Sequence, residues 1–338
     1  MTKGLHLAGI EVVAGIDVDA KCSETYSINN APTRFICSDI RDITVDRVHD
    51  IVPEIIEHPE NILFAGCAPC QPFSKQRKTA PNGEEATILG EFGRLVEQTL
   101  PGQVLVENVF GIANIPGYST FRRFLNVLAR NNYNFEYSII DAKYYGVPQT
   151  RRRLVLIAMR GARVTMPPIT HGKGLQQFVC VRDTIERFPE IAAGETYPSV
   201  ANHVAAHITS LNMERLRNTP HDGGDRRSWP DRLVLTCHKQ YEGHTDVYGR
   251  MFWDKPAPTL TSKCYSISNG RYGHPVQNRA ISLREAAAIQ TYPDDYVFYG
   301  NNTHIGLQIG NSVPVKLGET LGRHIVLMRN NVNQAIND

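Results

Sequence analysis

The sequence lacks long hydrophobic runs. No stretch approaches the roughly 18 uninterrupted apolar residues of a membrane-spanning helix, and no apolar segment with a small-residue cleavage site opens the chain. We therefore expect an intracellular protein without a membrane partner. Cysteine is scarce: the seven cysteines are odd in number and irregularly spaced, which favours reduced thiols over a disulfide framework.

An excess of one charge is also missing. The 338 residues include 36 Lys and Arg and 34 Asp and Glu, for a net charge of +2. The distribution is uneven, because residues 143–279 contain roughly 20 basic and roughly 11 acidic residues. We expect phosphate contacts in this part of the chain, although a solvated arginine-rich face gives the same pattern.

The first 160 residues alternate short β-branched runs with helical patterns, which predicts an α/β, doubly wound domain with a parallel sheet. The predicted strands are 12–16, 34–37, 61–65, 103–107, 135–141 and 154–159, and the predicted helices are 20–29, 45–57, 86–100 and 120–131. Residues 161–277, rich in Pro, Gly, His and Arg, predict a smaller, loop-rich domain with helices only at 181–188 and 208–217. Helical patterns return at 282–290 and 313–328, and we expect the last helix to pack on the first domain.

Cys70 lies in the polar segment 66–74, directly after the apolar run 61–65. Open α/β sheets keep their reactive groups at strand ends, and Pro69 restricts the backbone that presents the thiol. With Cys67 it also forms a C-x-x-C pattern, which a redox pair would share. A buried structural cysteine is a further alternative. We expect no metal, since no second Cys or His pair accompanies it.

Glu107 ends the apolar run 103–106. Parallel strands end on the same side of a sheet, so Glu107 and Cys70 can lie across one cleft. A carboxylate at the lip of a hydrophobic strand is partly desolvated and can hold a proton near neutrality. A helix cap or an ion-pair partner is the common alternative for such a residue.

Gln149, Arg151 and Arg153 alternate just before the strand 154–159. Residues two apart in an extended segment share a face, and guanidinium groups there can bind a base carbonyl or a phosphate. A basic strand edge that prevents aggregation would give the same pattern.

Five motifs follow in order: Pro69-Cys70-Gln71, Glu107-Asn108-Val109, Gln149-x-Arg151-x-Arg153, the segment 279–293, and Gln308-Ile309-Gly310-Asn311-Ser312-Val313-Pro314. Together they resemble the bacterial DNA (cytosine-5) methyltransferases over nearly the whole chain. The resemblance implies a Rossmann-like, S-adenosylmethionine-dependent methyltransferase domain of residues 1–160 plus 278–338. Residues 161–277 would form the target-recognition domain, and double-stranded DNA would be the partner.

The resemblance also implies the chemistry. In the family, a cysteine thiolate adds to C6 of a cytosine swung out of the duplex, which makes C5 nucleophilic toward the methyl donor. Cys70 matches this thiolate, and Glu107 matches the residue that supports N3. Arg151 and Arg153 would contact the O2 side of the base and a nearby phosphate.

The implied cofactor is S-adenosyl-L-methionine, with S-adenosyl-L-homocysteine as product and no metal. Cofactor contacts are expected at Asp17, Val18, Asp39, Ile40, Pro69, Asn311, Ser312 and Val313. DNA contacts are expected at Gln71, Ser74, Gln149, Arg226, Arg227, Lys239 and Arg250. A strand-end Asp is elsewhere often only a helix cap. We expect a monomer in the cytoplasm, associated with the nucleoid through DNA, either solitary or paired with a cognate restriction endonuclease.

The opening of the chain departs from the family pattern. Members begin with a strand and a Phe-x-Gly-x-Gly-Gly loop, whereas residues 1–9 look like the helix after that loop. The resemblance therefore implies that the first strand is missing, through a start site placed too late or in a degenerate, catalytically silent DNA-binding homologue. Residues 85–87 also lack the arginine that usually ends the catalytic loop. A tRNA cytosine-5 methyltransferase, which shares the first two motifs, is the third alternative.

Overall fold

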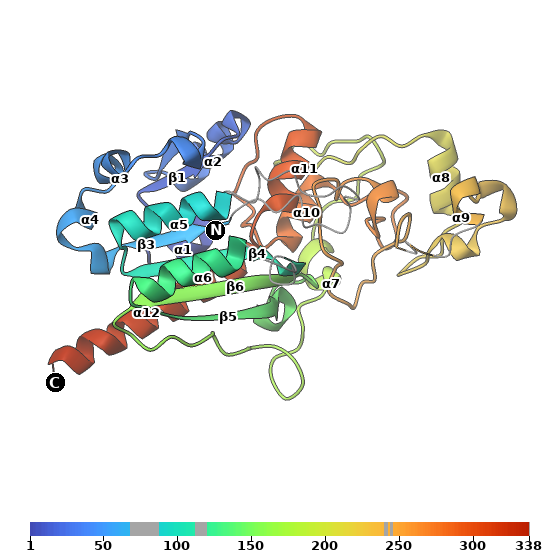
Figure 1. Cartoon of the computed structure of the whole chain (residues 1–338). Helices are drawn as coiled ribbons and strands as arrows, with labels where there is room; N and C mark the ends of the chain where they lie inside the picture. Colours follow the sequence, from blue (N-terminus) through green and yellow to red (C-terminus); the bar gives the residue numbers. More distant parts are fainter. Residues whose placement is uncertain (68–87, 112–119, 240–242, 244–245, 338) are drawn as a thin grey trace. The chain divides into compact units, whose positions relative to one another are not determined.

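The computed structural model (Figure 1) describes residues 1–67, 88–111, 120–239, 243 and 246–337. The chain divides into two compact units. Unit 1 comprises Met1–Asp141, Arg152–Ile169 and Leu317–Asp338, and unit 2 comprises Ala142–Arg151 and Thr170–Lys316. Residues 278–316 thus cluster with unit 2, although the sequence assigns them to the catalytic domain. The functional division at 161–277 concerns what each part does, and it stays a prediction.

Within the residues that the structure describes, unit 1 contains six strands in two sheets. The strands are β1 (Ala14–Asp17), β2 (Arg34–Cys37), β3 (Leu63–Gly66), β4 (Gln103–Val109), β5 (Tyr133–Asp141) and β6 (Arg152–Arg160). β1 and β2 form a two-stranded parallel sheet, and the other four have the order β3-β4-β6-β5. All six predicted strands are therefore present, with ends shifted by up to a few residues.

The larger sheet is mixed, which corrects the prediction of a parallel sheet. β3 and β4 are parallel, whereas β6 runs antiparallel to both β4 and β5. The physical reason lies in the connection from Asp141 to Arg152, which is too short for the helical crossover that a parallel neighbour requires. The direction of β6 brings its first residues to the carboxyl end of β4.

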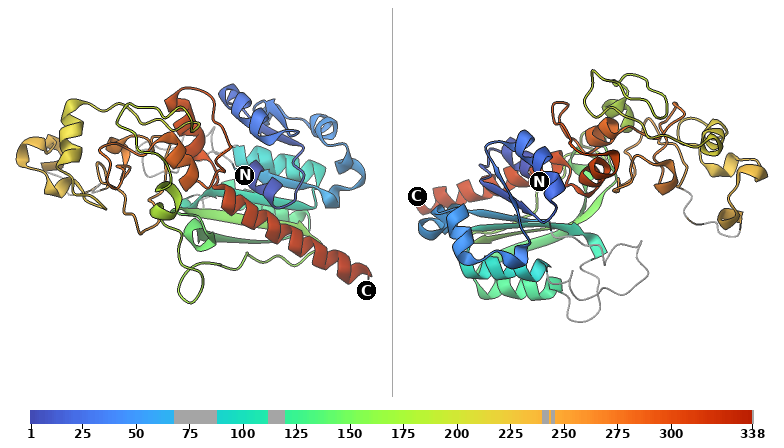
Figure 2. Two further views of the ribbon diagram at one scale, coloured as in Figure 1. Left: turned by 180° about the vertical axis from the view of Figure 1, so that it is seen from behind. Right: turned by 90° about the horizontal axis from the view of Figure 1, so that it is seen from above.

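Helices cover both faces of this sheet (Figure 2). α5 and α6 lie on one face, and α1 and α12 lie on the other. The helices of unit 1 are α1 (Thr2–Leu7), α2 (Ser23–Asn30), α3 (Val45–Ile51), α4 (Glu54–Glu57), α5 (Ile88–Thr99), α6 (Thr120–Arg130) and most of α12 (Val315–Asn337). α12 packs closely on α1, because a Cβ at Gly322 would come within 2.7 Å of the Cβ of Ala8.

The core of unit 1 explains why α5 and α6 pair with the sheet. Apolar residues at helical spacing on α5 and α6 pack on alternate residues of β4 and β6. The fully or nearly buried members are Leu89, Phe92, Val96, Val104, Val106, Phe121, Phe124, Leu128, Tyr133, Leu154, Leu156 and Ala158. Because side chains alternate across a strand, Val104 and Val106 face these helices, and Glu107 points to the opposite face.

Unit 2 contains α7 (Val181–Ile185), α8 (Ser210–Arg217), α9 (Thr236–Lys239), α10 (Leu283–Ile289) and α11 (Asn302–Asn311). α10 is wholly buried and begins with a capping box between Ser282 and Glu285. Glu285 also forms a bidentate ion pair with Arg279, at 2.7 Å for each contact. Burial opposes ionisation of Glu285, but the hydrogen bonds and charge of Arg279 lower its pKa overall.

Sequence patterns predicted the described helices of both units except α9 and α11, and α1 matches the helix expected at the start of the chain. α9 corrects the prediction that the loop-rich region has helices only at 181–188 and 208–217, and no helix was expected at 302–311. Within the described part of the chain, no helix is both long and apolar enough to cross a membrane.

Candidate active site

Glu107 lies at the carboxyl end of β4, next to the end of β3. The register pairs Gly66 with Val106, so the residue after β3, Cys67, comes beside Glu107. Cys67 is exposed, and its thiol is free. The predicted residues Pro69, Cys70, Gln71 and Ser74 lie outside the described residues.

Arg153 is the partner of Glu107. Their side chains are diagonal neighbours on the antiparallel β4–β6 pair, since Glu107 is opposite Val155 and Arg153 is opposite Val109. Arg153 Nε lies 3.1 Å from Glu107 Oε1, and only 14% and 9% of the two side chains are exposed. This geometry fixes the orientation of the Glu107 carboxyl group at the carboxyl end of β4.

Glu107 keeps acceptor capacity within this pair. Its Oε1 is buried, and among the described residues it makes no hydrogen bond of good geometry. A buried carboxylate oxygen in this state is an available partner for an N–H donor of a bound molecule. The Glu107 side chain can thus accept a hydrogen bond from a bound molecule.

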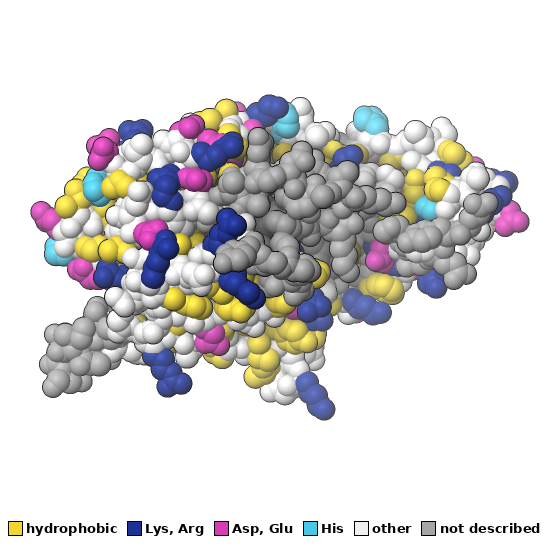
Figure 3. Space-filling view, in the orientation of Figure 1, with side chains coloured by type: hydrophobic (Ala, Val, Ile, Leu, Met, Phe, Trp, Pro, Cys, Tyr) yellow, Lys and Arg dark blue, Asp and Glu magenta, His cyan; other side chains and the backbone are white. Residues whose placement is uncertain are grey.

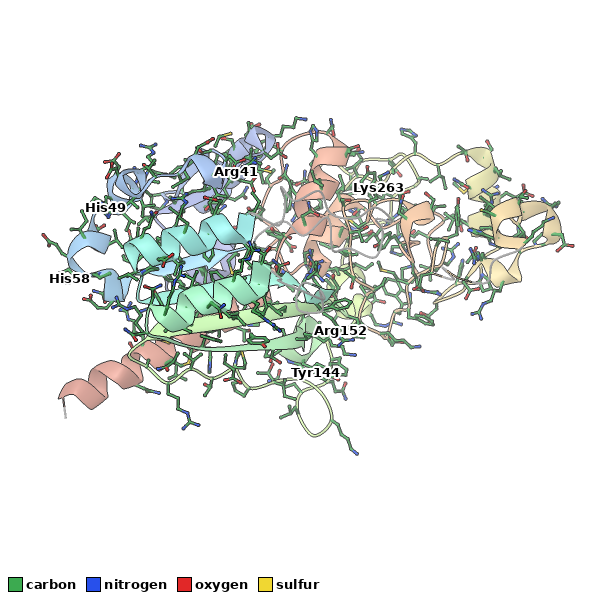
Figure 4. The ribbon with its side chains drawn as sticks, in the orientation of Figure 1. Arg41, His49, His58, Tyr144, Arg152 and Lys263 are labelled. Atoms are coloured by element: carbon green, nitrogen blue, oxygen red, sulfur yellow. The ribbon has the colours of Figure 1, made fainter. Side chains whose placement is uncertain are left out.

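The residues after β1 and β2 form a second group in unit 1. Asp17 is exposed and accepts a hydrogen bond from the backbone of Asp19 at 2.8 Å. Arg41, labelled in Figure 4, binds both carboxylate oxygens of Asp39 at 3.0 and 2.7 Å. These hydrogen bonds hold the pKa of Asp39 at about 2. Val18 is 69% exposed, and Ile40 is half-buried.

Gln149 and Arg151 belong to unit 2 and are buried. Arg151 donates to the backbone carbonyls of Leu260, Gly310 and Ser312 at 3.0 to 3.2 Å. Gln149 donates to Gln290 at 2.9 Å. Sequence reasoning gave no role to Gln290, although it lies in the fourth motif.

The turn after α11 contains three predicted cofactor residues. Asn311 is exposed, and Val313 is 3% exposed. The hydroxyl of Ser312 donates to the carbonyl of Ile309 at 2.8 Å. Asn311 thus presents its side chain outward, whereas the other two point into unit 2.

The predicted DNA contacts of the loop-rich region differ in exposure. Lys239 is exposed at the end of α9, and the Arg227 side chain is 76% exposed and paired with Asp225. Arg226 is buried and donates to the carbonyl of Gly243 at 2.7 Å. On the face of unit 1 seen in Figure 3, by comparison, basic side chains lie over α5 and α6, and acidic side chains of these two helices come from α5 alone.

The predicted DNA contact at Arg250 needs a correction. It has no exposed surface, and its guanidinium donates to Thr219, His274, Gln277, Leu216 and Asn278 at 2.6 to 3.1 Å. Burial lowers its pKa to about 10, so it stays charged at neutral pH. A DNA contact would break these hydrogen bonds, so we remove Arg250 from the proposed DNA-facing residues.

Replacing Arg250 by Met is expected to lower the free energy of unfolding by about 3 to 5 kcal/mol, because buried carbonyls lose their donor. Urea unfolding measures this loss. Lys239→Met is the control, and its stability should change by less than about 0.5 kcal/mol. In this variant the slope of the logarithm of DNA affinity against the logarithm of salt concentration should become smaller by about one unit. Weaker DNA binding by Arg250→Met at unchanged stability would restore Arg250 as a contact.

A family model described as C-5 cytosine-specific DNA methylase matches residues 1–327. The chain belongs to this family. The match confirms the predicted enzyme class, a DNA (cytosine-5) methyltransferase of the bacterial type.

Individual relatives agree over nearly the full length. The methylase is 36% identical over 331 residues to the Type II methylase M.HgiDII of Herpetosiphon aurantiacus, covering 96% of this chain and 91% of the relative. It is 28% identical to the Type II methyltransferase M1.HphI of Haemophilus parahaemolyticus, covering 97% and 84%.

Solved structures show the fold. A crystal structure described as a DNA modification methyltransferase encoded within an E. coli prophage has a TM-score of 0.76 at 18% identity, covering 97% of this chain and 96% of that one. The S. pombe Dnmt2 methyltransferase gives 0.63 at 15% identity, covering 98% and 95%. The methylase therefore has an α/β methyltransferase fold, and the roles of its single residues stay predictions.

Proposed function

We propose that this chain transfers a methyl group from S-adenosylmethionine to C5 of a flipped-out cytosine within a specific duplex DNA sequence, through a bond between Cys70 and C6. The observation that carries the proposal is the buried Glu107–Arg153 pair at the carboxyl end of β4. A carboxyl group beside the end of β3 suits a base whose N3 must receive a proton or a hydrogen bond.

The residues after β1 and β2 fit the nucleoside part of the cofactor. Asp17 is exposed and Asp39 is ionised, so both can accept hydrogen bonds from hydroxyl or amine groups. Val18 and Ile40 offer aliphatic surface for a purine ring. S-adenosylmethionine, when bound, supplies the methyl group. Family resemblance also assigns Asn311, Ser312 and Val313 of unit 2 to the cofactor, together with Pro69, which lies outside the described residues.

The chain's own residues then act on the base. The Cys70 thiolate forms a bond to C6, and the electron pair of the C5–C6 bond moves toward C5 and N3, where Glu107 holds the proton or hydrogen bond. Arg153 orients the Glu107 carboxyl group, and family resemblance assigns it to the O2 edge of the base. After C5 has gained the methyl group, loss of its proton to water re-forms the double bond and expels the thiolate.

Binding to DNA is proposed for the exposed basic residues of the recognition region, 161–277. Arg227 and Lys239 are accessible to phosphates or bases. By family resemblance, Gln71 and Ser74 fill the space that the flipped base leaves in the duplex. Gln149, from the third motif, is also proposed to contact DNA. The protein would act in the cytoplasm as a monomer, alone or with a restriction endonuclease, as the Type II names of its relatives suggest.

We also propose that a further parallel strand completes the sheet. Within the described residues, β1 pairs only with β2 and β3 pairs only with β4, so each has an open edge. Val13, just before β1, is 39% exposed, and Ile16, within β1, is 41% exposed. An added strand would satisfy those backbone groups and carry the loop for the methionine end of the cofactor.

Bisulfite sequencing of DNA from cells that express the chain tests the function, because it reports both activity and target sequence. We expect complete conversion resistance at one short motif. The assay includes a version extended by upstream in-frame codons, and activity of that version alone would support the added strand. DNA retention without methylation in either version would favour the silent homologue, and methylation of tRNA but not duplex DNA would overturn the DNA substrate.

A further inference from the structure

Arg151 and Gln149 form the centre of a buried polar network in unit 2. Arg151 is 2% exposed and Gln149 has no exposed surface. The network also includes Gln290, which follows α10 and has no exposed surface. We call these three residues the buried clamp.

The clamp holds the turn 309–313 from two directions. Arg151 donates to the carbonyl of Gly310 at 3.2 Å and to that of Ser312 at 3.0 Å. Gln290 donates to the carbonyl of Ile309 at 2.6 Å and approaches both oxygens of Ser312 at 3.2 and 3.3 Å. A planar guanidinium can span two carbonyls in this way, and an ammonium group cannot do so in the same geometry.

The same side chains hold the segment 258–262. Arg151 donates to the carbonyl of Leu260 at 3.1 Å, and the backbone N–H of Leu260 donates to Gln149 Oε1 at 2.9 Å. The two backbone groups of one residue are therefore fixed by the clamp. This segment also packs against the last turn of α11, where a Cβ at Gly310 would overlap the backbone of Thr261 and Ser262.

The end of α10 adds a strained link to the turn. Thr291, the residue after Gln290, has a left-handed backbone with φ of 62°, a conformation that is strained for a β-branched residue. Its hydroxyl accepts a hydrogen bond from the backbone of Lys316 at 2.8 Å. The backbone of Val315 donates to the carbonyl of Gln290 at 3.1 Å. Both ends of the turn are thus tied to α10.

We propose that Arg151 is a positioning residue that fixes the turn 309–313 against the segment 258–262, rather than a catalytic residue that touches the base. The Arg151 donors described above are directed to backbone carbonyl oxygens of unit 2. The inference rests on the proposed function only where it assigns this turn to the cofactor. Because the turn and the segment share one guanidinium, loss of Arg151 should loosen both together.

Amide hydrogen exchange on Arg151→Lys and Arg151→Met tests the positioning role. We expect exchange at residues 309–313 and 258–262 to become at least tenfold faster in both variants. Lys263→Met, which removes an exposed charge next to the segment (Figure 4), is the matched control and should leave both regions unchanged. If Arg151→Met does not fold, Gln290→Leu replaces it, with the same expected result for the turn. Unchanged exchange in either region would overturn the proposal.

Binding and rate measurements separate positioning from catalysis. The dissociation constant of S-adenosylhomocysteine, measured by calorimetry, should rise at least tenfold in Arg151→Lys, whereas the single-turnover rate at saturating cofactor should fall far less. A hundredfold lower saturated rate at unchanged affinity would overturn the proposal, since a group touching the base behaves in that way. If the unsubstituted protein binds no S-adenosylhomocysteine, the proposed function fails, and the exchange data still decide the positioning role.

Discussion

Replacing Cys70 by Ser is expected to abolish methyl transfer while leaving the affinity for duplex DNA within about tenfold, or roughly 1.4 kcal/mol. A serine hydroxyl has almost the same size as a thiol, but it is far less ionised at neutral pH and is a much weaker nucleophile toward C6. Binding should survive, because phosphate and groove contacts do not depend on the nucleophile. Methyl transfer from labelled S-adenosylmethionine and filter binding measure the two effects.

Cys67→Ser is the matched control for this prediction. Cys67 is a second thiol three positions earlier, directly after β3, and it is exposed. We expect its replacement to be nearly silent in both assays. Equal losses from the two substitutions would instead support a dithiol pair. A 5-fluorocytosine duplex should trap a denaturation-resistant conjugate with the unsubstituted protein and none with Cys70→Ser.

The strands of unit 1 could be predicted from local pattern alone. The run Val104–Val106 is continuously apolar, and each of its residues is buried in the structure. Such a run is expected where helices cover both faces of a strand. The direction of β6 could not be predicted in this way, because periodicity does not record orientation. The length of the connection after Asp141 was the available signal.

That orientation decides the candidate site. In an all-parallel sheet, the first residues of β6 would lie at the opposite end from the carboxyl end of β4. The antiparallel arrangement places Arg153 beside Glu107. The motifs indicated that both residues matter, but the pairing between them follows only from the sheet topology.

Buried arginines were the other limit of sequence reasoning. Sequence reasoning expected Arg250 to contact DNA and Arg151 to contact the O2 side of the base, but each is buried against carbonyl oxygens. Those acceptors come from segments far away in the sequence, so no local pattern identifies them. α11 was missed for a related reason: its glycines have low helix propensity, but Gly310 is needed for the close approach to residues 261–262.

Replacing Glu107 by Gln is expected to lower the single-turnover rate by about 10² to 10⁴-fold, the usual contribution of a positioned acid or base. The amide keeps the size of the side chain but cannot supply a proton or a charge at N3. Affinity for S-adenosylhomocysteine should change little, since the proposed cofactor residues of unit 1 follow other strands. Glu136→Gln, an exposed glutamate on β5, is the control and should leave the rate unchanged.

Arg153 should act through the same carboxylate, and a double-mutant cycle tests this. Arg153→Met leaves Glu107 partly buried without its ion-pair partner, so we expect a rate loss of about 10 to 10²-fold. The double variant should lose little more than Glu107→Gln alone, because residues that work as one unit are not additive. Arg152→Met, one position away and exposed, is the matched control (Figure 4). Multiplicative losses in the double variant would show that the two side chains act independently and would contradict the pairing as the basis of the site.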